Sequence, residues 1–198
     1  MIPLQVRRSG LGSWRQKRIE AVAGEILNLL GNAANQEYFG EPVSQLQHAL
    51  QCAQLARDAG ADDETILAAL LHDVGHLLDA PREVGVVHHD EIGARWLLER
   101  GFSQRVASLV AGHVDAKRYL TATNAAYAAK LSPASAATLV LQGGPMGADE
   151  ATKFAVDPLF ADKLRLRSWD EQGKRLDWDV TGLPSYRELL LEHLRAQS

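Results

Sequence analysis

The feature that most constrains this chain is a series of long proline-free stretches made of helix-forming residues. The seven prolines stand only at positions 3, 42, 81, 133, 145, 158 and 184, and the stretches between them are rich in Ala, Leu, Glu, Gln and Arg. These residue types favour the helix, whereas proline interrupts a helix interior. No stretch shows the apolar–polar alternation of a half-buried strand. The sequence therefore predicts an all-α fold.

Apolar spacing and capping residues predict the individual helices. Residues 14–30 carry apolar side chains near the i, i+3, i+4, i+7 spacing of an amphipathic helix, and Gly31 ends that stretch. Further helices are expected at residues 44–58, 64–78, 89–100, 103–113, 124–131, 133–141, 148–163 and 185–196. Residues 32–43, 79–88 and 142–147 are expected to be non-helical. Neither a repeat nor a linker composition is visible, so residues 1–198 are expected to form one compact domain, with residues 1–13 as a flexible basic start.

Composition excludes several classes of protein. A chain of 198 residues buries roughly 70% of its unfolded surface, so it needs no disulfide, and its single Cys52 predicts a reducing, cytoplasmic setting. The net charge of -4 gives no electrostatic reason to expect nucleic-acid binding. No apolar run approaches the roughly 20 residues that cross a bilayer, and no signal peptide is recognisable. We therefore expect a cytoplasmic monomer or homodimer with neither nucleic-acid nor membrane partners.

The seven histidines are the most informative chemical feature. His72 and His76 lie four residues apart on an apolar predicted helix, so they share one face, and Asp73 flanks that face. Two imidazoles and a carboxylate are suitable ligands for a transition metal, and a buried charge persists only when it is paired or coordinated. Two histidines at this spacing are more often ordinary core or surface residues, but the adjacent Asp73 favours a metal site. Gly75 lets another element approach closely.

Two of the histidines and two aspartates resemble a known metal-binding signature. His48, His72-Asp73 and Asp170 match the His…His-Asp…Asp pattern of the HD-domain superfamily, and His76, His89 and His113 resemble the additional ligands of its dinuclear members. The resemblance implies a helical HD-domain fold that holds two metal ions. It assigns His48, His72, Asp73 and Asp170 to the first ion, and His76, His89, His113 and a bridging Asp73 to the second.

A more specific resemblance is to the mixed-valent diiron oxygenases of this superfamily that act on phosphonates. It is carried by the segments 38–41, 45–53, 68–76, 112–120, 142–146 and 169–171. It implies an Fe(II)/Fe(III) pair with O2 as co-substrate. The implied reaction cleaves the C–P bond of a small organophosphonate, 1-hydroxy-2-aminoethylphosphonate or its N-trimethyl analogue, to glycine or betaine plus phosphate.

The resemblance also implies residues that bind the substrate. Lys117, four residues after His113, would direct a cation towards the metals, although by itself it reads as a solvated lysine. A polar stripe near a helix N-terminus and an arginine fork resemble the phosphonate-holding residues, with Arg165 as a competing candidate for the fork. These predicted substrate-binding residues are Lys117, Ser135, Thr138, Gln142 and Arg167.

Tyr38 and Glu41 lie in a stretch predicted to be non-helical, and the resemblance makes them a lid. The tyrosine would occupy an open iron position until substrate displaces it, and the glutamate would contact the amine end, where it suits either head group. Without the resemblance, these residues form a turn with an aromatic anchor. Tyr38, Glu41 and Lys117 are the predicted catalytic residues.

Two other functions remain open from the residues alone. A dinuclear HD-domain phosphohydrolase would use a metal-activated water on a nucleotide or phosphate ester. A regulatory HD-like module would bind partners without chemistry. The Tyr38–Glu41 lid and the set of residues around Lys117 favour the oxygenase over the hydrolase, and the intact set of seven candidate ligands weighs against the regulatory module.

Overall fold

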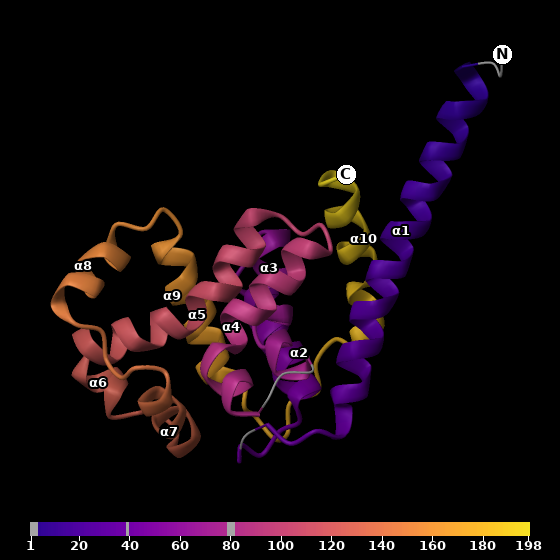
Figure 1. The fold of residues 1–198 in the computed structure, drawn as a ribbon. Helices are drawn as coiled ribbons and strands as arrows, with labels where there is room; N and C mark the ends of the chain where they lie inside the picture. The colour runs from indigo at the N-terminus through magenta and orange to yellow at the C-terminus, as the bar shows by residue number, and fades with distance from the viewer. Residues whose placement is uncertain (1–3, 39, 79–81) are drawn as a thin grey trace.

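A computed structural model describes residues 4–38, 40–78 and 82–198, with side chains described except at residues 4–11 and 82–86. Helices account for every named element of this described part, which confirms the all-α prediction (Figure 1). A single antiparallel bridge joins Glu37 to Ser44.

The described elements follow one another along the chain as ten α-helices and three short 3-10 helices. They are α1 (Leu4–Asn32), η1 (Ala33–Asn35), α2 (Gln45–Asp58), α3 (Asp63–Leu71), η2 (Val74–Leu77), α4 (Arg82–Glu99), α5 (Gln104–Thr123), α6 (Ala125–Ala128), α7 (Pro133–Leu141), α8 (Ala148–Ala155), α9 (Phe160–Gln172), η3 (Leu183–Tyr186) and α10 (Arg187–Ala196).

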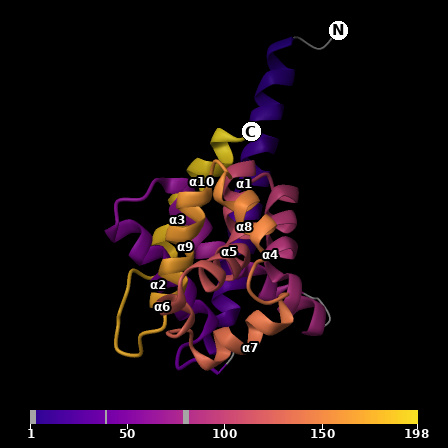
Figure 2. The same cartoon turned by 90° about the vertical axis from the view of Figure 1, so that its left-hand side faces the viewer.

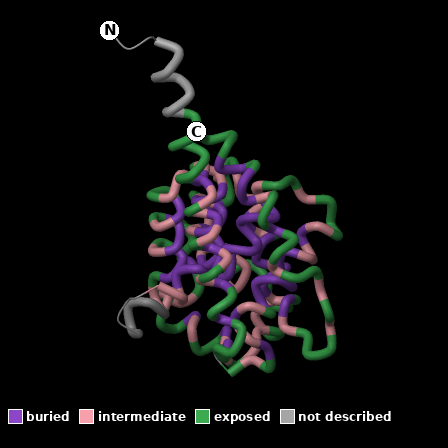
Figure 3. Tube along the Cα trace, turned by 90° about the vertical axis from the view of Figure 1, so that its right-hand side faces the viewer, coloured by how far each residue is buried: buried purple, intermediate pink, exposed green. Residues whose placement is uncertain are grey.

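One apolar core joins the central helices. Leu67 of α3, Leu97 of α4, Leu109 of α5 and Leu166 of α9 are fully buried in it, and Ala53 of α2 packs with them. Full burial of one leucine side chain stabilises the fold by roughly 1.5–3 kcal/mol. Helices α1 and α10 run side by side along one edge, whereas α6, α7 and α8 lie on the opposite side (Figures 1 and 2). Buried residues fill the middle of the bundle (Figure 3).

Capping residues set the helix starts that the sequence predicted best. Ser44 accepts a hydrogen bond from the backbone N–H of Gln47 and donates its own backbone N–H to the Gln47 side chain, so α2 begins with a capping box. Ser132 caps α7, whose first residue is Pro133. Both helices have the predicted extent to within one residue.

The helix predicted at 64–78 is wrong in its second half. The α-helix ends at Leu71, and Asp73 adopts φ -99° and ψ 10° before the 3-10 helix η2. At Gly75 the backbone of His89 comes so close that a Cβ atom would lie 1.9 Å from the His89 carbonyl oxygen. The close approach expected at Gly75 is therefore present, and it presses η2 against α4.

Other boundaries also differ from the predictions. Helix α4 begins at Arg82 and is kinked at His88, so residues 82–88 are not the expected loop, while residues 79–81 lie outside the described residues. Helix α5 continues to Thr123, which places His113 in its interior rather than at its end.

The helix predicted at 148–163 is two helices, α8 and α9, because Pro158 interrupts the stretch. Three further predictions differ at their ends. The helix predicted at 14–30 begins at Leu4, the one at 124–131 covers only Ala125–Ala128, and the last begins at Arg187. The flexible start at residues 1–13 stays a prediction.

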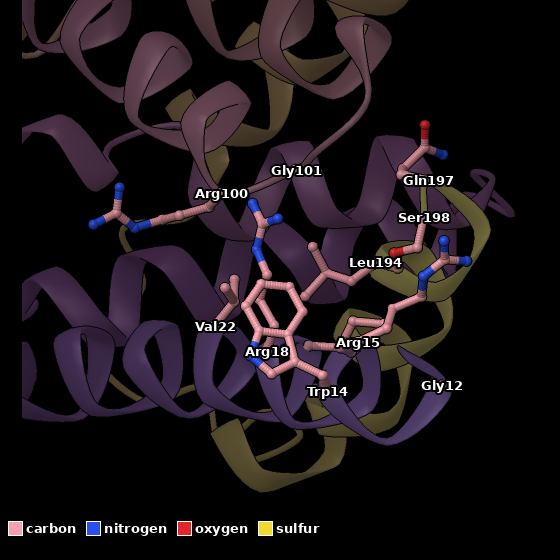
Figure 4. Close-up of a pocket in the computed structure, with 11 residues that line it drawn as sticks. Gly12, Trp14, Arg15, Arg18, Val22, Arg100, Gly101, Leu194, Gln197 and Ser198 are labelled. Carbon is pink, nitrogen blue, oxygen red and sulfur yellow. The ribbon is translucent and has the colours of Figure 1, made fainter. Parts of the chain in front are cut away.

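A cleft on the side of α1 contains none of the predicted site residues. Trp14, Arg15 and Arg18 of α1 line it together with Arg100 and Leu194 (Figure 4). Trp14 is 66% exposed. In the described part of the chain, no helix combines the length and the apolar character needed to cross a membrane.

The contact at Gly75 predicts a stability difference. Gly75→Ala should lower the free energy of unfolding by about 1–3 kcal/mol, because η2 must move away from the His89 backbone. Gly24→Ala is the matched control, since nothing lies within 4 Å of the added Cβ and alanine favours the helix by roughly 0.5–1 kcal/mol. Urea denaturation followed by circular dichroism measures both. Equal midpoints for the two variants would contradict the contact.

Candidate metal centre

Asp73 occupies the centre of the cluster of predicted ligands. Its Oδ1 lies 3.3 Å from His89 Nε2 and 3.4 Å from His113 Nε2. Its Oδ2 lies 3.6 Å from His48 Nε2 and 3.4 Å from His72 Nε2. Each carboxylate oxygen therefore faces a different pair of histidines, which is the arrangement in which one carboxylate can bridge two ions.

Within each pair the imidazoles converge through the same nitrogen. His48 Nε2 and His72 Nε2 are 3.1 Å apart, and His89 Nε2 and His113 Nε2 are 2.9 Å apart. The pairs come from four helical elements, because α2 and the end of α3 supply the first and α4 and α5 supply the second. The kink at His88 and the continuation of α5 past His113 are thus part of how the second pair is positioned.

Backbone carbonyls orient three of these rings. His72 and His113 each place Nδ1 near the carbonyl three residues earlier, at 2.9 and 2.7 Å, and His48 Nδ1 lies 2.8 Å from the Gly173 carbonyl oxygen. A proton on Nδ1 satisfies each carbonyl and leaves the Nε2 lone pair directed at the centre. Hydrogen bonding of this kind fixes the tautomer of metal-binding histidines in proteins.

Asp170 and His76 complete the set. Asp170 Oδ1 lies 3.4 Å from His48 Nε2 and 4.0 Å from His72 Nε2, whereas its Oδ2 accepts a hydrogen bond from Arg167. The His76 ring stacks on His89 with 3.8 Å between centroids. The structure therefore brings all seven predicted ligands together, and their roles as metal ligands stay predictions.

Unsatisfied buried oxygens test whether metal ions fit these residues. Asp73 Oδ2 and Asp170 Oδ1 are both buried, and neither accepts a hydrogen bond from any described residue. A buried carboxylate oxygen without a donor is costly unless a cation compensates it. Imidazole nitrogens and carboxylate oxygens together suit iron, manganese or zinc. The residues present therefore fit two transition-metal ions.

Protonation states agree with this interpretation at two histidines and at Asp170. Burial lowers the pKa of His72 to about 4, and burial also holds the pKa of His76 well below its usual range, so both rings stay neutral at pH 7. Burial alone would raise the pKa of Asp170, but the Arg167 guanidinium outweighs it and lowers that pKa well below normal. Neutral imidazoles and ionised carboxylates are the forms that bind metals. At His48 and His113 burial alone would lower the pKa, but Cys52 and Asp170 beside His48, and Asp73 beside His113, outweigh burial and raise it.

Cys52 lies beside the first pair, and its thiol together with His48 and His72 forms one group that could hold a metal ion. Its Sγ is 3.7 Å from His48 Nε2, and the thiol donates to the Trp169 carbonyl oxygen at 3.5 Å. Burial raises the pKa of the Cys52 thiol, which keeps it protonated, whereas metals bind the thiolate. Asp73 and Asp170 are therefore the better partners of His48 and His72.

A cavity beside the ligands brings the predicted substrate and lid residues to the same place. Its walls combine ligands with cationic, hydroxyl and amide side chains. They include Tyr38, Glu41, Asp73, His76, His89, His113, Lys117, Ser135, Thr138, Gln142, Arg167, Asp170 and Lys174.

The two predicted cations of the cavity are both buried. Lys117 is 3% exposed, and its Nζ donates to Thr138 Oγ1 at 3.0 Å. Burial, and then the charge of Arg167, lowers the pKa of Lys117 to about 7. Arg167 donates through Nη2 to Ser135 Oγ at 3.4 Å. The competing Arg165 is half exposed and pairs with Asp162, so it does not line the cavity.

The lid residues lie against both parts of the site. The Tyr38 ring stacks on His48 with 4.0 Å between centroids. A tight turn follows, in which the Glu41 N–H donates to the Tyr38 carbonyl oxygen at 2.7 Å. Gly40 has a φ of 79°, which a residue with a side chain rarely adopts. Glu41 in turn accepts a hydrogen bond from Ser132 Oγ at 2.6 Å.

Sequence reasoning missed Lys174, together with Glu171 and Tyr127 around Arg167. Arg167, Asp170, Glu171 and Lys174 stand at i, i+3, i+4 and i+7, the spacing of one helical face. This spacing is visible in the sequence, but it was not recognised because the helix in this region was predicted to end at residue 163. Tyr127, which accepts a hydrogen bond from Arg167 Nε at 2.8 Å, had no such signal.

Comparison with known proteins agrees with the geometry. Residues 46–141 match the HD domain family. The chain belongs to the HD-domain family. This HD-domain chain is 39% identical over 169 residues to the [1-hydroxy-2-(trimethylamino)ethyl]phosphonate dioxygenase (glycine-betaine-forming) of Leisingera caerulea, covering 79% of this chain and 84% of that one.

Two further relatives of the HD-domain chain have similar coverage. It is 40% identical over 167 residues to the hydroxymethylphosphonate dioxygenase of Gimesia maris, covering 80% of this chain and 83% of that protein. It is 38% identical over 175 residues to an uncharacterized protein of Acanthamoeba polyphaga mimivirus, covering 85% and 80% respectively. The expected resemblance to phosphonate-cleaving HD-domain dioxygenases is thus confirmed.

Adjacent histidines allow a matched test of the metal centre. His89→Ala should reduce the metal content from roughly two ions per chain to roughly one, because it removes one of the imidazoles that face Asp73 Oδ1. His88→Ala should leave the content unchanged, since the His88 side chain is 54% exposed and pairs only loosely with Glu91 at 3.7 Å. Plasma mass spectrometry measures both. Equal metal loss in the two variants would argue against the second metal position.

Proposed function

We propose that this HD-domain protein holds two iron ions and uses O2 to cleave the C–P bond of a 1-hydroxyalkylphosphonate, releasing a carboxylic acid and phosphate. The observation that carries the proposal is the direct contact between two features. A carboxylate faces two histidine pairs, and a cavity with buried Lys117 and Arg167 opens on the same residues. The names of two relatives as phosphonate dioxygenases support it.

The chemistry of the substrate explains why oxygen is required. A C–P bond has no polarised oxygen leaving group, so the hydroxyl-bearing carbon must be oxidised before the bond breaks. The substrate and one O2 together contain every atom of the carboxylic acid and phosphate, so no further reductant is needed. Iron held by the seven ligands would supply O2 activation and Lewis acidity.

The protein's own residues bind and orient the phosphonate. Lys117 and Arg167 compensate the dianion, and a guanidinium presents donors in a planar fork that matches its oxygens. Ser135, Thr138 and Gln142 add hydroxyl and amide groups from α7 and its C-terminus. Because these residues come from three separate elements, only a folded bundle assembles them.

Tyr38 and Glu41 act in this proposal as a lid. The Tyr38 ring covers His48, so a substrate that reaches the first metal position must displace it. Burial, with the charge of Asp73 second, raises the pKa of Tyr38 well above its usual value, so the phenol is neutral at pH 7. A neutral phenol leaves a metal more readily than a phenolate does, which suits a group that moves aside.

The expected substrates with an amine end, 1-hydroxy-2-aminoethylphosphonate and its N-trimethyl analogue, stay predictions and give glycine or betaine. Mixed-valent Fe(II)/Fe(III) iron, a cytoplasmic setting and a monomeric or homodimeric state stay predictions as well. We expect small organophosphonates, rather than macromolecules, as the partners of this site.

The dependence on oxygen distinguishes oxidation from hydrolysis. Iron-loaded protein should release phosphate from 1-hydroxyalkylphosphonates in air, and the release should fall to background without O2. Phosphorus NMR follows the phosphonate and phosphate signals in the same sample. Phosphate release that continues without O2 would favour the alternative of a dinuclear phosphohydrolase.

Substitution of Lys117 tests the phosphonate position. Lys117→Met should raise KM for the phosphonate by about tenfold or more, because one hydrogen bond to a charged group contributes roughly 1.5–3 kcal/mol. Metal content should be unchanged, since Lys117 is not a ligand. Lys153→Met, on the exposed surface of α8, is the matched control. A KM equal to that of the control would contradict the assignment.

The lowered pKa of Lys117 adds a pH signature. Above pH of about 7 the free protein loses the Lys117 proton, so the cation that attracts the phosphonate disappears as pH rises. The KM of the wild type should therefore increase relative to that of Lys117→Arg between pH 7 and 9, because arginine stays charged. Taking the ratio of the two proteins cancels the titration of the phosphonate itself.

A further inference from the structure

Lys174 places a second ammonium group at the lid end of the cavity. Its Nζ donates to Glu41 Oε1 at 2.9 Å and to Ser135 Oγ at 3.2 Å, and it lies 5.9 Å from the centre of the Tyr38 ring. The Lys174 and Glu41 side chains are both only 11% exposed. Lys174 therefore connects the lid to the helix that carries the predicted phosphonate-binding residues.

This contact changes what Glu41 can bind. Burial alone would raise the pKa of Glu41, but hydrogen bonds from Ser132 and Lys174 outweigh burial and lower it. The carboxylate is ionised, and its charge is already compensated by Lys174. An incoming ammonium group would have to displace Lys174 or lie beside it. Two cations at contact distance in a poorly solvated cavity repel each other strongly.

The remaining charges of the cavity favour an anion without a cationic end. Arg167 is paired with Asp170 and Glu171, so its charge is partly compensated. The Lys117 ammonium group donates to the neutral Thr138, and it forms no ion pair with a carboxylate of the described residues. A phosphonate dianion supplies the missing negative charge, whereas a zwitterionic substrate brings a positive charge to the end where Lys174 already lies.

We propose that Lys174 determines specificity by closing the lid end of the cavity to cationic head groups, so that the preferred substrate is a small, amine-free 1-hydroxyalkylphosphonate. Hydroxymethylphosphonate is the simplest member of this class. The inference rests on the proposed function and narrows its substrate. It reverses the expectation that Glu41 serves as the contact for an amine.

The corresponding reaction balances with O2 alone. Hydroxymethylphosphonate and one O2 give formate and phosphate, with one oxygen atom going to carbon and one to phosphorus. The C–P bond, one C–H bond and the O–O bond break, and the C–H hydrogen ends as a proton on oxygen. Carbon loses four electrons and O2 gains the same four.

A competition between substrates tests the inference. The iron-loaded wild type is assayed in air with hydroxymethylphosphonate, 2-amino-1-hydroxyethylphosphonate and its N-trimethyl analogue, with phosphate as the readout. We expect kcat/KM for hydroxymethylphosphonate to exceed both others by about tenfold or more. Equal values, or a preference for either amine, would overturn the inference.

Variants test whether Lys174 causes the preference for hydroxymethylphosphonate over the amine substrates. Lys174→Met frees the Glu41 carboxylate, so the ratio of kcat/KM for the amine substrate to that for hydroxymethylphosphonate should rise about tenfold, mainly through KM. The double variant Glu41→Gln/Lys174→Met removes the buried pair together, and it should abolish that gain. Lys153→Met is the surface control. A purely structural lysine would lower all the rates without changing the ratio, and an unchanged ratio would overturn the inference.

A binding measurement separates this inference from the proposed function. Calorimetry on the metal-loaded protein compares methylphosphonate with 2-aminoethylphosphonate, which correspond to hydroxymethylphosphonate and the amine substrate without their hydroxyl groups. Tighter binding of methylphosphonate to the wild type, with the difference reduced in Lys174→Met, supports the charge argument even where no phosphonate is turned over. Tighter binding of the amine to the wild type would overturn it. Loss of all turnover with this binding preference intact would count against the proposed function alone.

Discussion

The structure of the site depends on one buried carboxylate, one oxygen of which accepts no hydrogen bond from the described residues. Asp73 directs its two oxygens to two different histidine pairs, and Oδ2 accepts no hydrogen bond from any residue described. A charge in that position is tolerated only if cations compensate it. The carboxylate reaches this position because the α-helix ends at Leu71 and the chain turns there. Close packing of Gly75 against the His89 backbone then brings the two pairs together.

Much of the chemistry could be predicted from the sequence, because it depends on residue type and short-range spacing. The fold class follows from helix formers and proline positions, and Ser44 and Ser132 mark helix starts by local hydrogen bonds. The break after His72 could not be predicted. It is stabilised by a contact between Gly75 and His89, and local propensity does not report contacts between separate elements.

The same limit explains why Lys174 was missed. A helix was predicted to end before Asp170, so the spacing that links Arg167, Asp170 and Glu171 to Lys174, just beyond the end of α9, was not recognised. The helix that carries Asp170 restarts after the proline at position 158, and only the whole bundle shows which face it turns inward. What a charged side chain does in the structure depends on the group with which it pairs. The hydrogen bond from Lys174 to Glu41 joins residues 133 positions apart, far beyond any sequence spacing.

Helix α5 is continuous from His113 to Lys117, so one helix carries both a predicted metal ligand and the proposed phosphonate contact. The spacing between these two functions is therefore constant, whatever the substrate. Glu41 lies instead on a loop, Ser132 caps α7, and Lys174 lies in the loop that follows α9. Mutagenesis that aims at new substrates can therefore be restricted to these three codons, because they can change without altering any of the predicted metal ligands.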